Sequence, residues 1–225
     1  MFKGRTVRLN QQIVDQGLVI LTWGNGSIID RDRGLIYIKP SGVNVNVLVD
    51  DDISVVDINT NKHISGKKPS VDTSIHTEIY RHFNHIDTII HTHSLYGTAY
   101  AQARRPIPCL GTTHADYFHG EIPVVYDLTP EEVAYNYEQN TGRSIVQYFM
   151  DHDIDHTHMS GCLVPSHGVF VWGRSNALEA AIVLEHVAKL AYMTSNIDPN
   201  LAPVSSHLTD KHFLRKHGEG KYYGQ

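Results

Sequence analysis

Short apolar runs separated by polar, glycine-containing turns recur along the chain, and this alternation is typical of β-strands. Two β-rich arms flank Asp30–Gly34, which predicts a hairpin in which Gly34 adopts a positive φ. Residues 161–173 predict a strand pair, or one strand interrupted at Pro165–Gly168. Further strands are predicted at residues 53–58, 88–94 and 122–127.

Helices are predicted between these strands from apolar periodicity and from capping residues. Thr129, Pro130 and Glu132 supply an N-cap, a proline at the first helical position and a capping-box glutamate, so a helix begins there. Ser70 and Ser175 are the expected N-caps of the helices that follow them. The other predicted helices span residues 5–17, about 72–83, 96–104 and 177–195.

This order of elements predicts an α/β fold whose mostly antiparallel sheet carries helices on its faces. With 225 residues, 41% of them hydrophobic, the chain can bury a substantial core. No linker, internal repeat or low-complexity run divides the sequence, so we expect a single domain over residues 1–225.

Composition argues against several classes of protein. The net charge is −5, and no stripe of lysine and arginine offers a surface for nucleic acid. No apolar run approaches the roughly 20 residues that span a bilayer, and the N-terminus lacks the apolar segment of a signal peptide. Because Cys109 and Cys162 are the only cysteines, we expect no disulfide framework and a cytoplasmic location.

Histidine is frequent, at 16 residues, and two histidines stand out by position. His91 and His93 follow the apolar run Thr88–Ile90. In a strand, residues i and i+2 point to the same side about 6.6 Å apart, so both imidazoles can reach one metal ion at about 2.0–2.1 Å. Two polar residues sharing one face of a strand would have the same spacing.

A third histidine and a carboxylate favour the metal interpretation. His167 follows the apolar run Cys162–Val164 at a chain bend, although a residue that stabilises its own turn has the same signature. Three histidines with an oxygen ligand such as Asp72 and an open position match a catalytic Zn²⁺ site, and Mn²⁺ or Co²⁺ also fit. His76, one helical turn after Asp72, is a competing ligand or a partner of the ligands.

Two loops of small residues, Trp23–Ser27 and Lys39–Gly42, have the composition of an anion site. Glycines let backbone N–H groups approach an anion, and Lys39 adds positive charge. Ser70, before a predicted helix, is a further candidate donor. Neither loop is a nucleotide-binding fingerprint, and ordinary turns explain both. If all three sites lie near one metal, they indicate a phosphorylated substrate.

Candidate acid–base chemistry occurs in the segment Gly111–Phe118, where Asp116 is a candidate proton carrier. A capped loop explains the same segment structurally. The tail after Leu208 is polar and glycine-rich, and its composition is that of a disordered terminus. The residues alone therefore predict a metalloenzyme that acts on a small anionic molecule.

Seven segments carry a family resemblance, namely TWGNGS, IKPSGV, PSVD, HTHS, GTTHADYF, SHGVFVWG and KHFLRKHGEGKYYGQ. Together they resemble the class II aldolase and epimerase superfamily, and in particular its bacterial L-ribulose-5-phosphate 4-epimerases. His-x-His and Ser-His-Gly are shared across the superfamily, whereas GTTHADYF and the KYYGQ-like ending mark the epimerases. The resemblance runs from about residue 20 to the C-terminus, and it implies a three-layer α/β/α fold.

The resemblance also implies roles for individual residues. The Zn²⁺ ligands would be His91, His93 and His167, with Asp72 on or beside the metal. Protons would be carried on opposite sides of the substrate by Asp116 and Tyr223, with Thr112 and His212 close by. The pocket for the substrate and its phosphate would be lined by Gly24, Asn25, Lys39, Ser41, Gly42, Ser70 and Val71. The superfamily forms four-fold tetramers with sites between subunits, which implies a homotetramer.

The implied reaction converts L-ribulose 5-phosphate to D-xylulose 5-phosphate by retro-aldol cleavage and re-addition. Val71 replaces the serine that is usual in the family, so we expect weaker phosphate binding, and Gly26 replaces a valine and loosens its loop. The alternatives are an epimerase for a related pentulose phosphate such as L-xylulose 5-phosphate, and a class II aldolase acting on a sugar phosphate. A non-catalytic, adducin-like binding protein and a metal buffer are further rivals.

Overall fold

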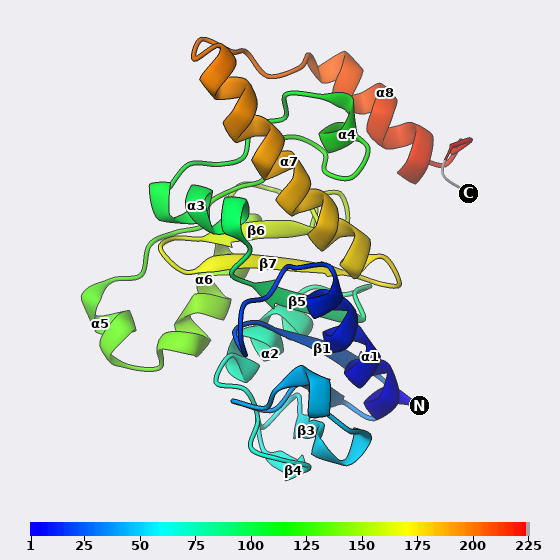
Figure 1. Ribbon diagram of the computed structural model, residues 1–225, viewed down its shortest axis with the longest axis vertical. Helices are drawn as coiled ribbons and strands as arrows, with labels where there is room; N and C mark the ends of the chain where they lie inside the picture. The colour runs from blue at the N-terminus through cyan, green and yellow to red at the C-terminus, as the bar shows by residue number, and fades with distance from the viewer. Residues whose placement is uncertain (224–225) are drawn as a thin grey trace.

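In the computed structural model, which describes residues 1–223, seven strands form one sheet in the order β4-β3-β2-β1-β5-β7-β6 (Figure 1). Every pair of neighbouring strands is antiparallel, in agreement with the predicted sheet. The strands are β1 (Asn25–Asp30), β2 (Leu35–Ile38), β3 (Ser54–Asp57), β4 (His63–Ser65), β5 (Thr88–Thr92), β6 (Gly161–Val164) and β7 (Gly168–Gly173).

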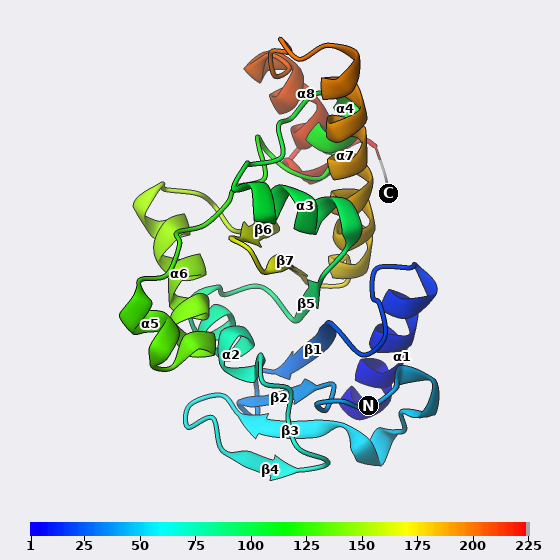
Figure 2. The same cartoon turned by 60° about the vertical axis from the view of Figure 1, so that its left-hand side comes forward.

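Helices cover both faces of this sheet, which gives the predicted three layers (Figures 1 and 2). On one face lie α1 (Phe2–Asp15), α3 (Leu95–Ala103) and α7 (Ala177–Ile197), and on the other lie α2 (Thr73–His82) and α6 (Tyr137–Asp151). The interior strand β5 is buried along its whole length because both of its faces are covered. The remaining helical segments are η1 (Val45–Val47), η2 (Asp50–Asp52), α4 (Thr112–Ala115), α5 (Pro130–Ala134) and α8 (Ser206–His217).

Strong local signals in the sequence predicted their elements correctly. Gly34 has φ +64° in the turn between β1 and β2. Thr129 and Glu132 form the predicted capping box at the start of α5. The segment 161–173 is a strand pair, and its turn holds Ser166 at φ +58°. This left-handed conformation costs a non-glycine residue about 1–2 kcal/mol, so surrounding contacts must hold the turn in place.

The strand predicted at residues 122–127 is wrong. Within this segment, the structure has only isolated bridges, at Ile122 and Val124. Pro123 stands between them and has no N–H to donate, so a continuous ladder cannot form there.

Two of the predicted helix caps are also wrong. Asp72, rather than Ser70, is the N-cap of α2, and Asn176, rather than Ser175, is the N-cap of α7. Neither side chain makes a capping hydrogen bond. The Asp72 carboxylate instead accepts a hydrogen bond from Asn25 Nδ2 at 2.7 Å, so it faces the neighbouring strand.

Most of the described tail is helical rather than disordered, since α8 extends to His217. Ser205 Oγ accepts a hydrogen bond from the Leu208 N–H and caps α8. Phe213 is 1% exposed, and α8 packs against α4 beyond the edge of the sheet (Figure 1). The last two residues of the KYYGQ ending lie outside the described part. No helix within residues 1–223 has the length and apolar character that crossing a membrane requires.

Candidate metal centre and substrate pocket

Three histidines from two distant parts of the chain meet at the C-terminal end of β5. His91 lies in β5, His93 follows the strand by one residue, and His167 lies in the turn between β6 and β7. One nitrogen from each ring lies within 4.8 Å of the others, and the Nε2 atoms of His91 and His93 are 3.1 Å apart. We call these three residues the His triad. Within residues 1–223, it is the one group of three or more histidine, cysteine, aspartate or glutamate side chains whose candidate ligand atoms lie within 4.8 Å of one another.

Strand pairing explains why the histidines meet. β5 and β7 are paired so that His91 faces Phe170 and Thr92 faces Val169. The turn that precedes β7 is therefore brought to the end of β5, and His167 with it. The His91 ring also stacks on Phe170 at a centroid distance of 4.2 Å. The strand predicted at residues 88–94 is thus shorter than expected, since it ends at Thr92.

Burial keeps the three imidazoles neutral, which leaves a nitrogen lone pair on each for a metal. Burial lowers the pKa of His91 to about 3, and it also lowers the pKa of His93 and of His167. In His91, Nδ1–H donates to the Val169 carbonyl oxygen at 2.9 Å, so Nε2 is the free ligand atom. In His167, Nδ1 lies 3.3 Å from the Tyr137 hydroxyl.

The distances within the His triad suit one shared ion. Two nitrogens bound to one tetrahedral ion at about 2.0–2.1 Å lie about 3.3 Å from each other. The separation of 3.1 Å between His91 Nε2 and His93 Nε2 is close to this value. The His triad can therefore bind a metal ion with little rearrangement.

Asp72 lies beside the His triad but is not part of the group within 4.8 Å. Burial raises the pKa of its carboxyl, but the nearby histidines and the hydrogen bond from Asn25 outweigh this effect, and the pKa lies below its ordinary value. Asp72 is therefore ionised and supplies one negative charge next to the candidate metal centre.

His76 is held behind Asp72 in a separate network. Its Nδ1 lies 2.7 Å from Ser27 Oγ, which in turn lies 3.0 Å from the Tyr80 hydroxyl. His76 is fully buried, and burial lowers its pKa to about 4. Its ring nitrogens are not part of the group that forms the His triad, so the geometry does not place His76 among those three histidines.

An open pocket of about 570 Å³ lies beside two of the three histidines. This pocket is lined by all of the predicted substrate-binding residues from three loops, at residues 23–27, 39–42 and 70–71. The full lining comprises Thr22, Trp23, Gly24, Asn25, Lys39, Pro40, Ser41, Gly42, Ser70, Val71, Asp72, His93 and His167. These three loops, which are far apart in the sequence, thus surround one cavity next to the candidate metal centre.

Backbone contacts bring these loops together. Gly24 has φ +86°, and a Cβ added there would lie 2.8 Å from the His91 carbonyl oxygen, so only glycine permits this approach. Ser41 N–H donates to the Lys68 carbonyl oxygen at 3.0 Å, which joins the second loop to the third. The two loops are also linked by a bridge between Pro40 and Pro69.

Lys39 provides the positive charge of this pocket. Its side chain is 3% exposed, and Nζ donates to the Thr22 carbonyl oxygen at 3.2 Å. Burial lowers its pKa, although the charge of Asp72 opposes this shift. Val71 lies on the pocket wall with 61% of its surface exposed. A bound phosphate would therefore meet an ammonium group and an apolar side chain.

The predicted proton carriers lie elsewhere in the chain, on α4 and α8. Asp116 follows α4 directly, and its carboxylate accepts hydrogen bonds from Arg215 at 2.9 Å and from His212 at 3.1 Å. The Arg215 guanidinium lies 4.3 Å from the centroid of the Tyr223 ring. Thr112 is the exposed first residue of α4. We call Thr112, Asp116, His212, Arg215 and Tyr223 the α4/α8 cluster.

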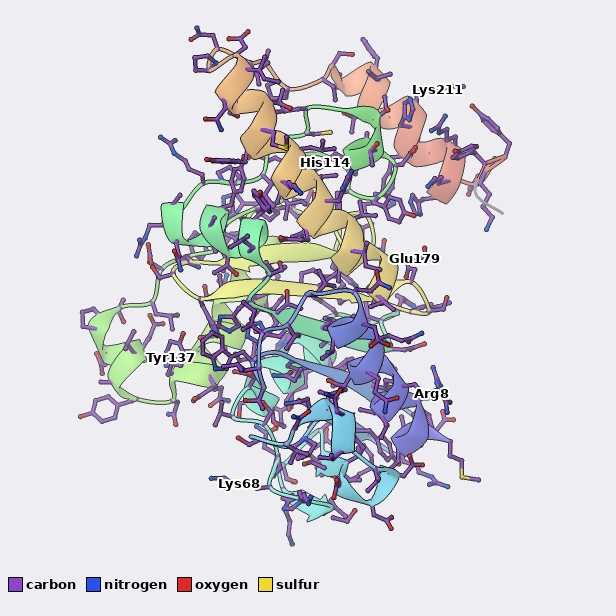
Figure 3. All side chains as sticks on the ribbon, in the orientation of Figure 1. Arg8, Lys68, His114, Tyr137, Glu179 and Lys211 are labelled. Atoms are coloured by element: carbon purple, nitrogen blue, oxygen red, sulfur yellow. The ribbon has the colours of Figure 1, made fainter. Side chains whose placement is uncertain are left out.

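The α4/α8 cluster and the pocket share no residue, so one chain does not bring the predicted proton carriers to the His triad. Figure 3 shows the separation through two labelled residues. His114 of α4 lies beside the upper part of α7, whereas Tyr137, which contacts His167, lies at the start of α6 on the other side of the sheet.

Burial raises the pKa of Asp116, but hydrogen bonds from Arg215 and His212 outweigh it, and the pKa lies below its ordinary value. The carboxylate is therefore ionised at neutral pH and can accept a proton.

Sequence reasoning missed Tyr137 and Arg215. No local pattern connects Tyr137 with His167, which is 30 positions away. Arg215 follows His212 by three residues, a spacing that places both on one face of a helix. This spacing is a local signal for a helix, but the polar, glycine-rich composition of the tail predicts disorder.

The sequence matches the family of the Class II Aldolase and Adducin N-terminal domain over residues 5–194. The chain belongs to this family. A His triad that can bind a metal is typical of the class II aldolase family.

Two relatives match almost the entire chain. The L-ribulose-5-phosphate 4-epimerase UlaF of Salmonella paratyphi C (strain RKS4594) is 44% identical over 227 residues, which cover 97% of this chain and 99% of that protein. The enzyme of the same name from Salmonella choleraesuis (strain SC-B67) matches with the same identity and coverage. The family resemblance found in the seven sequence segments is therefore confirmed.

Solved structures confirm the class II aldolase-like fold. An L-fuculose 1-phosphate aldolase superposes with a TM-score of 0.80 at 23% identity and covers 94% of both chains. YgbL of Escherichia coli superposes with a TM-score of 0.72 at 20% identity and covers 93% of this chain and 96% of its own. At these identities the likeness concerns the fold alone.

Proposed function

We propose that this protein is an L-ribulose-5-phosphate 4-epimerase, which inverts carbon 4 of its substrate to give D-xylulose 5-phosphate. The observation that carries the proposal is the meeting of the His triad with the pocket that contains Lys39. A metal site next to a cavity with a buried cation suits a sugar phosphate. The near full-length relatives described as L-ribulose-5-phosphate 4-epimerases support this substrate.

The substrate explains why such a site is needed. The hydrogen on carbon 4 is not adjacent to the ketone at carbon 2, so its removal would not give a stabilised carbanion. A hydroxyl group on carbon 4 does allow the bond between carbons 3 and 4 to break in a retro-aldol step. The two-carbon aldehyde that carries the phosphate then turns and adds back through its other face, which inverts carbon 4.

We assign Zn²⁺ to the His triad, with His91, His93 and His167 as ligands and Asp72 on or beside the ion. Three neutral imidazoles and an adjacent carboxylate are a donor set that Zn²⁺ favours. When bound, the ion supplies Lewis-acid stabilisation of the negative charge that develops on substrate oxygens. Asp72 also fixes Asn25 through their hydrogen bond of 2.7 Å, so the amide is oriented where the substrate enters.

The phosphate has to be held while the bond between carbons 3 and 4 is broken. We assign this task to the charge of Lys39 and to donors of the two neighbouring loops, namely Ser41, Gly42, Ser70 and the backbone N–H of Val71. Gly24 lets the backbone of the first loop come close to the substrate. Retention of the phosphate keeps the two-carbon fragment in the pocket, so it re-adds instead of escaping.

We assign the movement of the carbon 4 hydroxyl proton to Asp116 and Tyr223, with Thr112 and His212 beside them. The ionised Asp116 accepts the proton on one face, and the Tyr223 hydroxyl exchanges it on the other. Because the α4/α8 cluster does not line the pocket of its own chain, we infer that it completes the pocket of a neighbouring subunit in a homotetramer.

An assay with purified, Zn²⁺-loaded protein tests this function. L-ribulose 5-phosphate should be converted to D-xylulose 5-phosphate, and the product can be identified by nuclear magnetic resonance. A class II aldolase would instead accumulate two fragments, and a preference for L-xylulose 5-phosphate would be seen when that sugar is supplied in parallel. An adducin-like protein or a metal buffer would turn over neither sugar, and that result would contradict the proposal.

A further inference from the structure

Glu185 of α7 binds the first turn of α3, the helix that begins two residues after His93. Its Oε1 accepts a hydrogen bond from the Tyr96 N–H, and its Oε2 accepts one from the Gly97 N–H, each at 2.9 Å. We infer that Glu185 is a positioning residue, which fixes the backbone that carries the metal ligand His93. The inference rests on the proposed metal function of the His triad.

The first turn of α3 depends on this carboxylate. The first four N–H groups of a helix have no partner within the helix, and a capping side chain usually satisfies one or two of them. Ser94 is the N-cap of α3, but its hydroxyl makes no capping hydrogen bond. Glu185 takes over that role from another helix, and its negative charge also suits the positive end of the α3 dipole.

His93 needs such support more than the other two ligands do. His91 is anchored by the Val169 carbonyl oxygen and His167 by the Tyr137 hydroxyl. Within the described residues, the one hydrogen-bonding contact of the His93 ring is with His91 itself. The position of His93 is therefore set by its backbone, which is held on one side by β5 and on the other by α3.

Close packing makes the position of α3 sensitive to Glu185. A Cβ added at Gly97 would lie 2.6 Å from Val169 Cγ2 and 3.2 Å from Leu184 Cδ2, so α3 already lies directly against β7 and α7. Leu184 is the neighbour of Glu185 in the sequence. A shift of the first turn of α3 away from α7 would thus move His93 relative to His91 and His167.

Metal titration of purified protein against a coloured chelator tests the inference. Glu185→Gln keeps the size of the side chain but presents an NH₂ group to one of the two N–H donors, and it should raise the metal Kd about tenfold. Glu185→Asp keeps the charge on a shorter side chain and should give an intermediate Kd. The matched control is Glu179→Gln, at an exposed residue in the first turn of the same helix (Figure 3), which should bind metal like the wild type.

A metal Kd for Glu185→Gln equal to that of the Glu179→Gln control would overturn the inference and leave the proposed function intact. A lower melting temperature of the metal-free variant with an unchanged metal Kd would also overturn it, because that result assigns Glu185 to stability alone. If Glu185→Gln does not fold, Glu185→Asp decides by the same comparison. If the wild type bound no metal, both the inference and the proposed function would fail.

Discussion

The Nε2 atoms of His91 and His93 lie 3.1 Å apart, although only His91 belongs to the strand. Both rings are neutral because burial lowers the pKa of each. The lone pairs of two neutral ring nitrogens at this distance repel each other unless the two nitrogens share a proton or bind one metal ion. The pair thus has the geometry of ligands, and the contacts that hold each ring become testable.

Tyr137 should contribute to metal binding through His167. Tyr137→Phe removes the hydroxyl that lies 3.3 Å from His167 Nδ1, and the loss of such a partner typically weakens metal binding about tenfold or more. Metal Kd measured by chelator competition checks this expectation. Tyr135→Phe is the control, because Tyr135 is 70% exposed. Equal metal affinity in the two variants would exclude the proposed role of Tyr137.

Val71 should limit the affinity for the phosphorylated substrate. Val71→Ser adds a hydroxyl donor on the exposed pocket wall, and one such hydrogen bond lowers KM about two- to tenfold. Steady-state kinetics with L-ribulose 5-phosphate measures the effect, and kcat should change little. Val49→Ser, at a site 57% exposed and outside the pocket, is the control. An unchanged or higher KM in Val71→Ser would mean that position 71 does not face the phosphate.

Mixed oligomers should reveal whether the site is shared between subunits. His93→Ala removes a metal ligand, and Asp116→Asn removes a proton carrier, so each variant alone should be inactive. When the two variants are co-expressed, about a quarter of the sites formed between subunits combine the intact pocket of an Asp116→Asn chain with the intact α4/α8 cluster of a His93→Ala chain. Activity should therefore return to about a quarter of the wild-type value.

The matched control for this experiment is a mixture of Asp116→Asn and Tyr223→Phe. Both substitutions are in the α4/α8 cluster, so no chain in this mixture carries an intact cluster and activity should stay low. Absence of recovery in the first mixture, although mixed oligomers form, would argue that each chain builds its own complete site.

The metal-free protein should lose stability as the pH falls below about 6.5. His76 and His114 are buried, and burial lowers the pKa of each from 6.5 to about 4. Between these values the unfolded state binds more protons than the folded state, so stability is complete above pH 6.5 and decreases towards pH 4.

Each of these two histidines should contribute up to about 1.4 kcal/mol of lost stability per pH unit in this window. Urea unfolding with a chelator present, at pH 7.5, 6.0 and 5.0, measures the change in the free energy of unfolding. A free energy that is the same at all three pH values would show that folding does not lower the pKa of either histidine.

The sequence predicted those parts of the fold for which a few neighbouring residues decide the structure. Gly34 and the capping box at Thr129 are examples, since a positive φ and a helix start are local properties. The strand predicted at residues 122–127 fails at Pro123, which has no N–H for a continuous ladder. The helix α8 was mispredicted because distant contacts decide it. Phe213 is buried only through packing between α8 and its surroundings, and the polar outer face of the helix concealed this.

The same distinction holds for the candidate site, where the residues with local sequence patterns were predictable and their supporting contacts were not. His91, His93 and His167 have recognisable local patterns, and the family resemblance connected them with Lys39 and Asp72. The supporting contacts have no such pattern. Glu185 is 89 positions from Tyr96, whose N–H it binds, and such a pair becomes visible only when β5, α3 and α7 are placed in space.

The assignment of the His triad as a catalytic metal site is tested by metal content and turnover, measured together on the wild type and on His91→Ala/His93→Ala. Elemental analysis should find about one metal ion per chain in the wild type, with conversion of L-ribulose 5-phosphate to D-xylulose 5-phosphate. The double variant should fold, as judged by circular dichroism, but contain no metal and give no product. Retention of both metal and turnover in the double variant would contradict the account.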